Sequence, residues 1–206
     1  VGALSRLLSL GYRGPVFMTD ETMQEAPQTL AAYANPADFA RFPLPAEQIR
    51  IFAPDDELQV GGLRIATGCS GHVAGGSWFA VSDGERCLAY TGDVVPDSSV
   101  FRMDPLPECD LLVLDASYGV DPVSGSERAQ AIAAWAAAHP QGCLLPTPLS
   151  GRSLELIAAL PEPIAIHEGM RGALRAQIDA HSMLVPGAAG LLRDKLARAA
   201  DWQEGK

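Results

Sequence analysis

Residues 68–94 read GCSGHVAGGSWFAVSDGERCLAYTGDV, and this stretch decides the fold that we expect for the chain. Two strand-forming runs, SWFAVS and RCLAYTG, flank Asp83-Gly84, a dipeptide that strongly indicates a β-hairpin. A glycine-rich loop with His72 precedes the hairpin, and Asp93 follows it. We therefore expect the imidazole and the carboxylate to converge along one rim of the sheet.

The same strand texture extends over residues 50–94, where short alternating strands are separated by turn signals. The continuous apolar run CDLLVLDAS follows at 109–117 and predicts a strand in a sheet covered on both faces. After Tyr118 the texture changes to alternating helices and strands, which predicts a parallel α/β unit. Its expected elements are a helix after Ser124 or Ser126, a buried strand at 143–149, a helix at 150–162, a strand at 163–169 and a helix at 170–181.

The first fifty residues predict two helices around a short strand. Leucine spacing indicates a helix that ends at Gly11, and residues 14–19 are typical of a strand. A second helix is expected over 21–34, capped by Thr19 or Asp20 and disturbed or divided by Pro27. The proline-punctuated residues 35–48 indicate an irregular excursion.

Composition places the chain among globular proteins. It has 206 residues, 48% apolar and 19% charged, and no apolar run approaches the roughly 20 residues of a membrane span. The net charge of −10 argues against binding to nucleic acid or anionic membranes by net charge alone, and it leaves open a local basic channel or a metal that attracts a phosphate. The four cysteines lack C-x-x-C spacing, so we expect free, mostly buried thiols and a cytoplasmic protein.

His72 and Asp93 suit a metal site. Imidazole and carboxylate are the usual nitrogen and oxygen ligands of Zn²⁺, and flanking glycines let the backbone come close. A surface or structural histidine and a turn-forming aspartate explain the same two residues. The residues alone leave both interpretations open.

Three motifs, SGHVAGGSW, YTGDVVPDSS and LLVLDASYG, occur in this order. Together they resemble consecutive motifs of the metallo-β-lactamase fold, and more narrowly of its β-CASP branch of metal-dependent nucleases. The resemblance implies that His72 is a zinc ligand, that Asp93 bridges two zinc ions and that Asp115 is a catalytic-site carboxylate. It also implies that Ser77 and Arg152 bind substrate, the latter at a helix N-terminus, where an anion is favoured.

The resemblance implies the fold as well. We expect an α/β chain in which residues 1–118 form part of a metallo-β-lactamase αββα sandwich and residues 119–206 form part of a β-CASP-like α/β domain. The chain opens inside a helical pattern at Val1, so we expect it to start part-way through a larger protein. The family's His-x-His-x-Asp-His cluster is absent from the sequence, and its late histidine motifs are not recognisable.

Two ligands cannot hold a catalytic dizinc centre, so we expect an incomplete or absent zinc site and no activity from these residues alone. The remaining histidines, His139, His167 and His181, are interpreted as structural or surface residues. The predicted function is that of a metal-dependent hydrolase fragment, a phosphodiesterase or nuclease in the intact protein. RNA, DNA and small phosphodiesters or esters all fit as substrates.

Two other functions stay open. One is a catalytically inactive scaffold of the same fold that binds a partner protein. The other is an α/β binding domain in which the motifs occur by chance. We expect no membrane partner for any of these functions, and the sequence leaves open whether the protein forms a homo-oligomer.

Overall fold

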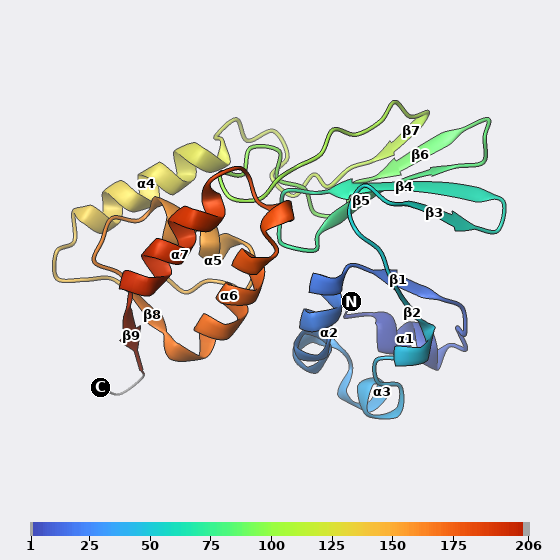
Figure 1. Cartoon of the computed structure of the whole chain (residues 1–206), viewed down its shortest axis with the longest axis horizontal. Helices are drawn as coiled ribbons and strands as arrows, with labels where there is room; N and C mark the ends of the chain where they lie inside the picture. Colours follow the sequence, from blue (N-terminus) through green and yellow to red (C-terminus); the bar gives the residue numbers. More distant parts are fainter. Residues whose placement is uncertain (1, 204–206) are drawn as a thin grey trace. The chain divides into compact units, whose positions relative to one another are not determined.

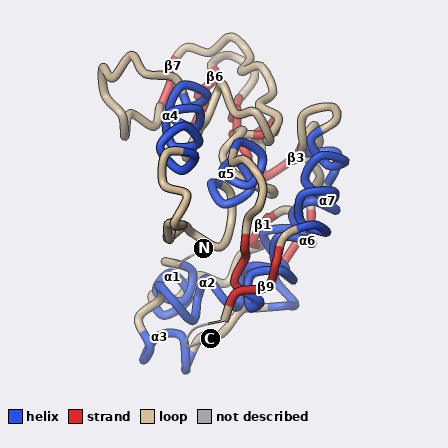
Figure 2. Tube along the Cα trace, turned by 90° about the vertical axis from the view of Figure 1, so that its left-hand side faces the viewer, coloured by secondary structure: helices blue, strands red, loops and turns tan. Residues whose placement is uncertain are grey.

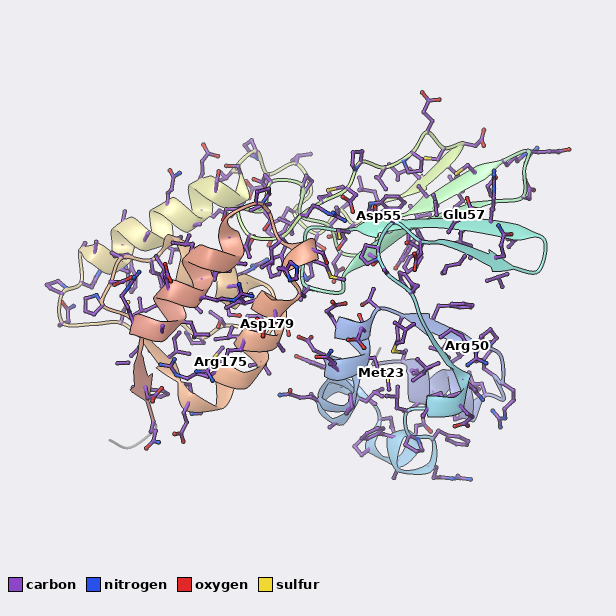
Figure 3. All side chains as sticks on the ribbon, in the orientation of Figure 1. Met23, Arg50, Asp55, Glu57, Arg175 and Asp179 are labelled. Carbon is purple, nitrogen blue, oxygen red and sulfur yellow. The ribbon has the colours of Figure 1, made fainter. Side chains whose placement is uncertain are left out.

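The computed structural model describes residues 2–203. The chain divides into two compact units, Val1–Asp56 and Glu57–Lys206, each built from helices and strands (Figure 1). Asp55 and Glu57, on either side of this division, are labelled in Figure 3. The architecture is therefore mixed α/β. The domain boundary predicted after residue 118 lies inside the second unit and stays a prediction.

The first unit is a small helical cluster with one pair of strands. Its elements are α1 (Leu4–Ser9), β1 (Val16–Met18), α2 (Asp20–Tyr33), α3 (Pro36–Arg41), the 3₁₀ turn η1 (Ala46–Gln48) and β2 (Ile49–Ile51). The strands β1 and β2 pair in parallel, with Val16 opposite Ile49. Leu4 and Leu8 of α1 pack with Leu30 of α2, which gives this unit its own apolar core.

Helix α2 begins as expected and continues through Pro27 without a break. The Thr19 hydroxyl accepts a hydrogen bond from the backbone N–H of Thr22 at 3.2 Å, so Thr19 is the cap of the two predicted candidates, Thr19 and Asp20. The expectation that Pro27 divides the helix was wrong. Ala26 and Leu30 are fully buried on either side of the proline, and this packing holds the helix continuous.

The predicted irregular excursion contains a short helix. Asn35 accepts hydrogen bonds from the backbone N–H groups of Ala37 and Asp38 at 3.0 and 3.2 Å, and Pro36 takes the first helical position. Proline suits that position because its missing N–H would have no helical partner there. The Asn-Pro pair therefore starts α3 rather than breaking the chain into loop.

The second unit begins with a five-stranded sheet. Its strands are β3 (Glu57–Val60), β4 (Leu63–Cys69), β5 (Ser77–Ser82), β6 (Cys87–Tyr90) and β7 (Leu111–Val113). They lie in sequence order, antiparallel from β3 to β6, and β7 joins β6 in parallel. The predicted hairpin is β5–β6, with the Asp83 carboxylate accepting the N–H groups of Glu85 and Arg86 at 2.9 and 2.8 Å.

The rest of the second unit is mainly helical (Figure 2). Its elements are α4 (Gly125–Ala137), α5 (Arg152–Ala159), β8 (Ala165–His167), η2 (Glu168–Met170), α6 (Arg171–Asp179), η3 (His181–Met183), α7 (Ala188–Arg198) and β9 (Ala200–Trp202). Leu154, Leu174 and Leu192, from α5, α6 and α7, are fully buried together. The strand β9, which the sequence did not predict, pairs in parallel with β8.

Two expectations about apolar runs in this unit were wrong. Residues 143–149 form no strand, and Leu144 is 70% exposed. Pro146 and Pro148 lack the N–H that a sheet ladder requires, so the run remains a loop. The run CDLLVLDAS does contain β7, but its side chains are exposed rather than covered on both faces by the described residues.

The four cysteines are free, as expected, but only Cys69 is buried, and Cys143 is exposed. Within residues 2–203, no helix combines the length and the apolar character that crossing a bilayer requires.

Candidate functional site

The strand register of the second unit sends three loops out from one edge of the sheet. Cys69, the last residue of β4, lies opposite Ser77, the first residue of β5. The strand β6 runs antiparallel to β5, so β6 ends at this same edge. The strand β7 is parallel to β6 and ends there as well. The loops that carry His72, Asp93 and Asp115 therefore leave the sheet side by side.

His72 and Asp93 meet at this edge. The Nε2 atom of His72 lies 3.9 Å from Oδ2 of Asp93. The His72 side chain is 41% exposed and that of Asp93 is 75% exposed, so both reach solvent. The structure thus brings together the two residues that the hairpin was expected to align, and their role as ligands stays a prediction.

Gly71 allows the two loops to approach so closely. The backbone N–H of Val95 donates to the carbonyl oxygen of Ser70 at 3.1 Å, which joins the loop after β6 to the loop before β5. A Cβ atom on Gly71 would lie 2.2 Å from the Val95 carbonyl oxygen, and Gly71 has a φ of +74°. Only glycine tolerates both conditions, so it sets the separation of His72 and Asp93.

Thr91 joins the ends of β6 and β7. It is fully buried, its N–H donates to the Val113 carbonyl oxygen at 3.1 Å, and its hydroxyl oxygen accepts the N–H of Asp115 at 3.0 Å. The same hydroxyl donates to the carbonyl oxygen of Gly92 at 2.8 Å. Because one side chain holds both strand ends, it fixes Asp93 and Asp115 relative to each other.

Asp115 is held in its ionised form. The Ser117 hydroxyl donates to Oδ1 of Asp115, and the Ser117 backbone N–H donates to the same atom at 2.9 Å. These donors lower the pKa of the Asp115 carboxyl, with smaller contributions from the backbone N–H of Val94 and the charge of His72. Asp115 therefore contributes negative charge beside His72 and Asp93 at neutral pH.

Arg152 lies at the start of α5, as expected, and the turn before it contacts the His72 loop. A Cβ atom on Gly151 would lie 2.9 Å from the His72 carbonyl oxygen, and Gly151 has a φ of +76°. The guanidinium of Arg152 donates to the Tyr118 hydroxyl at 2.6 Å. Arg152 thus reaches from the His72 side of the site to the loop that follows Asp115.

Ser77 lies at the same edge of the sheet, whereas the three remaining histidines lie elsewhere. Ser77 is the first residue of β5, and within residues 2–203 its buried hydroxyl oxygen has no hydrogen-bond partner. The ring of His139 packs on Trp135, with 4.2 Å between centroids. His167 lies in β8, and Nδ1 of His181 is 3.0 Å from the carbonyl oxygen of Asp179, which Figure 3 labels on α6.

The donors of the site fit part of a zinc coordination shell. Two donor atoms at tetrahedral angles on Zn²⁺, with bonds near 2.0–2.1 Å, lie about 3.4 Å apart. The distance between Nε2 of His72 and Oδ2 of Asp93 is 3.9 Å, which is close to this value. In the part of the chain that the structure describes, no group of three or more His, Cys, Asp or Glu side chains is placed to hold a metal.

Sequence reasoning missed the residues that organise the site. Thr91 and Gly71 were interpreted only as parts of motifs. A threonine at a strand end can bond to a neighbouring loop, and a glycine next to a candidate ligand indicates a close approach of two backbone segments. Tyr118 was noted only as a boundary, and Arg128, whose guanidinium lies 5.4 Å from the Tyr118 ring centroid, was not considered.

The chain is similar in sequence to a ribonuclease and similar in structure to a protein of unknown function. No family model matches the chain. Ribonuclease TTHA0252 of Thermus thermophilus is 34% identical over 130 residues, which are 59% of this chain and 30% of that protein. A protein of unknown function from Enterococcus faecalis has a similar crystal structure over 77% of this chain and 42% of its own, with a TM-score of 0.50 and 13% identity. The latter similarity concerns the fold alone, and the chain spans under a third of the ribonuclease.

Proposed function

We propose that the protein is a metal-dependent phosphodiesterase that cleaves RNA, with the metallo-β-lactamase fold of the β-CASP branch. The observation that carries the proposal is the approach of His72 Nε2 to within 3.9 Å of Asp93 Oδ2, at the edge where three loops meet. The 34% identity to a ribonuclease supports RNA as the substrate. The net charge of −10 is no obstacle, because a bound metal and local arginines can attract a phosphate into an acidic protein.

In this proposal His72 and Asp93 hold zinc. Zinc, when bound, supplies Lewis acidity toward a phosphoryl oxygen. A catalytic zinc takes about three protein ligands, so the proposal requires further ligands from polypeptide outside residues 1–206.

The other side chains position the reacting groups. Asp115, whose carboxyl pKa is lowered chiefly by Ser117, stays ionised and accepts hydrogen bonds beside the metal ligands. Thr91 keeps Asp115 and Asp93 at a constant separation through its bond to the Asp115 N–H. Arg152 presents a guanidinium to the phosphodiester, since arginine matches the geometry of phosphate oxygens. Ser77 keeps its proposed role in substrate binding only if its hydroxyl, which is buried among residues 2–203, becomes accessible when RNA binds.

The test uses the protein at the full length that its gene encodes. We expect His72→Ala to lose bound zinc and to lower the cleavage rate of a fluorescent single-stranded RNA by roughly 100-fold or more, because second and third ligands alone hold the ion weakly. His139→Ala is the matched control, since that ring packs on Trp135 and touches none of the site residues. Metal content and cleavage rate are measured on the same samples.

Retention of zinc and activity by His72→Ala would overturn the proposal. Absence of both zinc and cleavage from the unaltered full-length protein would overturn it too, in favour of the inactive scaffold.

A further inference from the structure

Three side chains from different elements meet next to the candidate site, and we call them the Tyr118 cluster. Tyr118 lies in the loop after β7, Arg128 in the first turns of α4 and Arg152 at the start of α5. The Arg128 guanidinium lies over the Tyr118 ring, 5.4 Å from its centroid. The Arg152 guanidinium donates to the Tyr118 hydroxyl at 2.6 Å. The tyrosine is thus held on one face and at its tip.

The Tyr118 cluster is linked to the site through the backbone on both sides. Tyr118 follows Asp115 by three residues, in a turn where the Gly119 N–H donates to the Ala116 carbonyl oxygen at 2.9 Å. Arg152 follows Gly151, whose Cβ position lies 2.9 Å from the His72 carbonyl oxygen. The cluster therefore connects the loop of His72 to the loop of Asp115.

The tyrosine ring is accessible despite these contacts, since Tyr118 is 53% exposed. A tyrosine that only braced two loops would gain more stabilisation by burying its ring. Arg128 stiffens the ring from one side through a cation–π contact. An exposed aromatic ring held at a fixed angle is a platform on which a nucleobase stacks.

The two arginines differ in the charge that remains available. Arg128 pairs with Asp121 at 2.5 Å, so its charge is offset. The Arg152 guanidinium has no carboxylate partner among residues 2–203, and its bond to Tyr118 uses one of five N–H donors. Arg152 is therefore suited to bind a phosphate.

We propose that the Tyr118 cluster binds one nucleotide of a single-stranded RNA next to the cleavage site. The base stacks on the exposed face of Tyr118, and the adjoining phosphate binds Arg152. This inference rests on the proposed function, because it names the subsite that presents the RNA to the His72–Asp93 pair. Tyr118 and Arg128 are positioning residues in this scheme.

The test measures binding without cleavage. The full-length protein is titrated in EDTA against a fluorescein-labelled single-stranded 12-mer RNA, and fluorescence anisotropy gives Kd at several salt concentrations. Tyr118→Leu removes the ring and is expected to raise Kd roughly 5- to 150-fold, the usual range for losing one stacked base. Tyr118→Phe keeps the ring, so its Kd stays much closer to that of the unaltered protein. Tyr33→Leu, at a tyrosine that is 81% exposed on α2, is the control for losing a surface tyrosine.

The salt dependence tests the phosphate contact. Arg152→Gln is expected to weaken binding and to reduce the slope of log K against log salt by about 0.7, because one phosphate contact with a single strand is lost. Arg193→Gln is the control, since this arginine of α7 pairs with Asp179 at 3.0 Å and is not part of the Tyr118 cluster. If Arg152 only braced the two loops, Arg152→Gln would lower the midpoint of thermal unfolding without changing the salt slope of RNA binding.

The outcomes separate this inference from the proposed function. A Kd for Tyr118→Leu within twofold of the unaltered protein would overturn the inference, even if cleavage is found. If Tyr118→Leu does not fold, an unchanged salt slope in Arg152→Gln overturns it instead. Binding that depends on Tyr118 and Arg152, in a protein that cleaves nothing, supports the subsite and overturns only the nuclease.

Discussion

Gly71→Ala tests the reasoning that a single glycine lets the two halves of the site meet. The new Cβ would lie 2.2 Å from the Val95 carbonyl oxygen, whereas carbon and oxygen in ordinary contact lie about 3.3 Å apart. The loops must therefore separate by about 1 Å, which breaks the bond from the Val95 N–H to the Ser70 carbonyl oxygen, worth about 1 kcal/mol net. The positive φ of +74° costs a further 1–2 kcal/mol or so with alanine.

Gly61→Ala is the matched control. Gly61 has a φ of +61°, and a Cβ there meets nothing within 4 Å. It carries the backbone cost of about 1–2 kcal/mol without the steric one. We expect Gly71→Ala to lose about 1–2 kcal/mol more than Gly61→Ala, since the loop bond and its surrounding packing are lost as well.

The assay is urea unfolding followed by tryptophan fluorescence, which gives the free energy of unfolding for each variant. Equal losses of unfolding free energy in Gly71→Ala and Gly61→Ala would refute the reasoning. The close approach of the two loops at Gly71 would then contribute nothing to stability. Zinc affinity of the full-length protein gives a second measurement. It should fall in Gly71→Ala and stay unchanged in Gly61→Ala if the loop separation sets the distance between His72 and Asp93.

Three further predictions concern the core and the thiols. Leu154→Ala should cost about 2–5 kcal/mol in urea unfolding because Leu154 is fully buried, whereas Leu144→Ala, at a leucine 70% exposed, should change stability by no more than about 0.5 kcal/mol. Burial raises the pKa of the Cys69 thiol to about 11, so a thiol reagent at pH 8 should modify the exposed Cys143 first, and simultaneous modification would contradict this. The folded protein keeps the Cys69 proton after the unfolded chain has lost it, so stability should fall as the pH rises from 9.0 to about 11, and Cys69→Ala should flatten this fall.

The parts of the fold that could be predicted depend on neighbours in the chain. Asp83-Gly84 forms its turn through hydrogen bonds from Glu85 and Arg86 to the Asp83 carboxylate, all within four residues. Thr19 and Ser124 cap their helices through bonds three residues away. Such contacts join residues that are neighbours in the chain, so residue types and spacing were enough to predict them.

The parts that could not be predicted depend on distant segments. Residues 143–149 were expected to form a buried strand because their apolar content is that of a strand, but no neighbouring strand pairs with them within residues 2–203. Pro27 was expected to disturb or divide its helix, but the helix is undivided because the burial of Ala26 and Leu30 outweighs the local effect of the proline. For Pro27, packing outweighs a local preference worth only a few kcal/mol, whereas in residues 143–149 the two prolines remove N–H groups that a sheet ladder needs.

The sequence by itself determined the hairpin and the helix caps, because each depends on a short stretch of chain. It also determined that His72 precedes the hairpin and that Asp93 follows it. Only the tertiary structure decided that the two side chains stand 3.9 Å apart, that Thr91 joins them to Asp115 and that Arg152 reaches Tyr118. These distances arise from strand register and from loop contacts at Gly71 and Gly151, which join segments up to eighty residues apart. Residue types specify the chemistry that a site can use, and the packing of remote segments specifies whether the groups are close enough to use it.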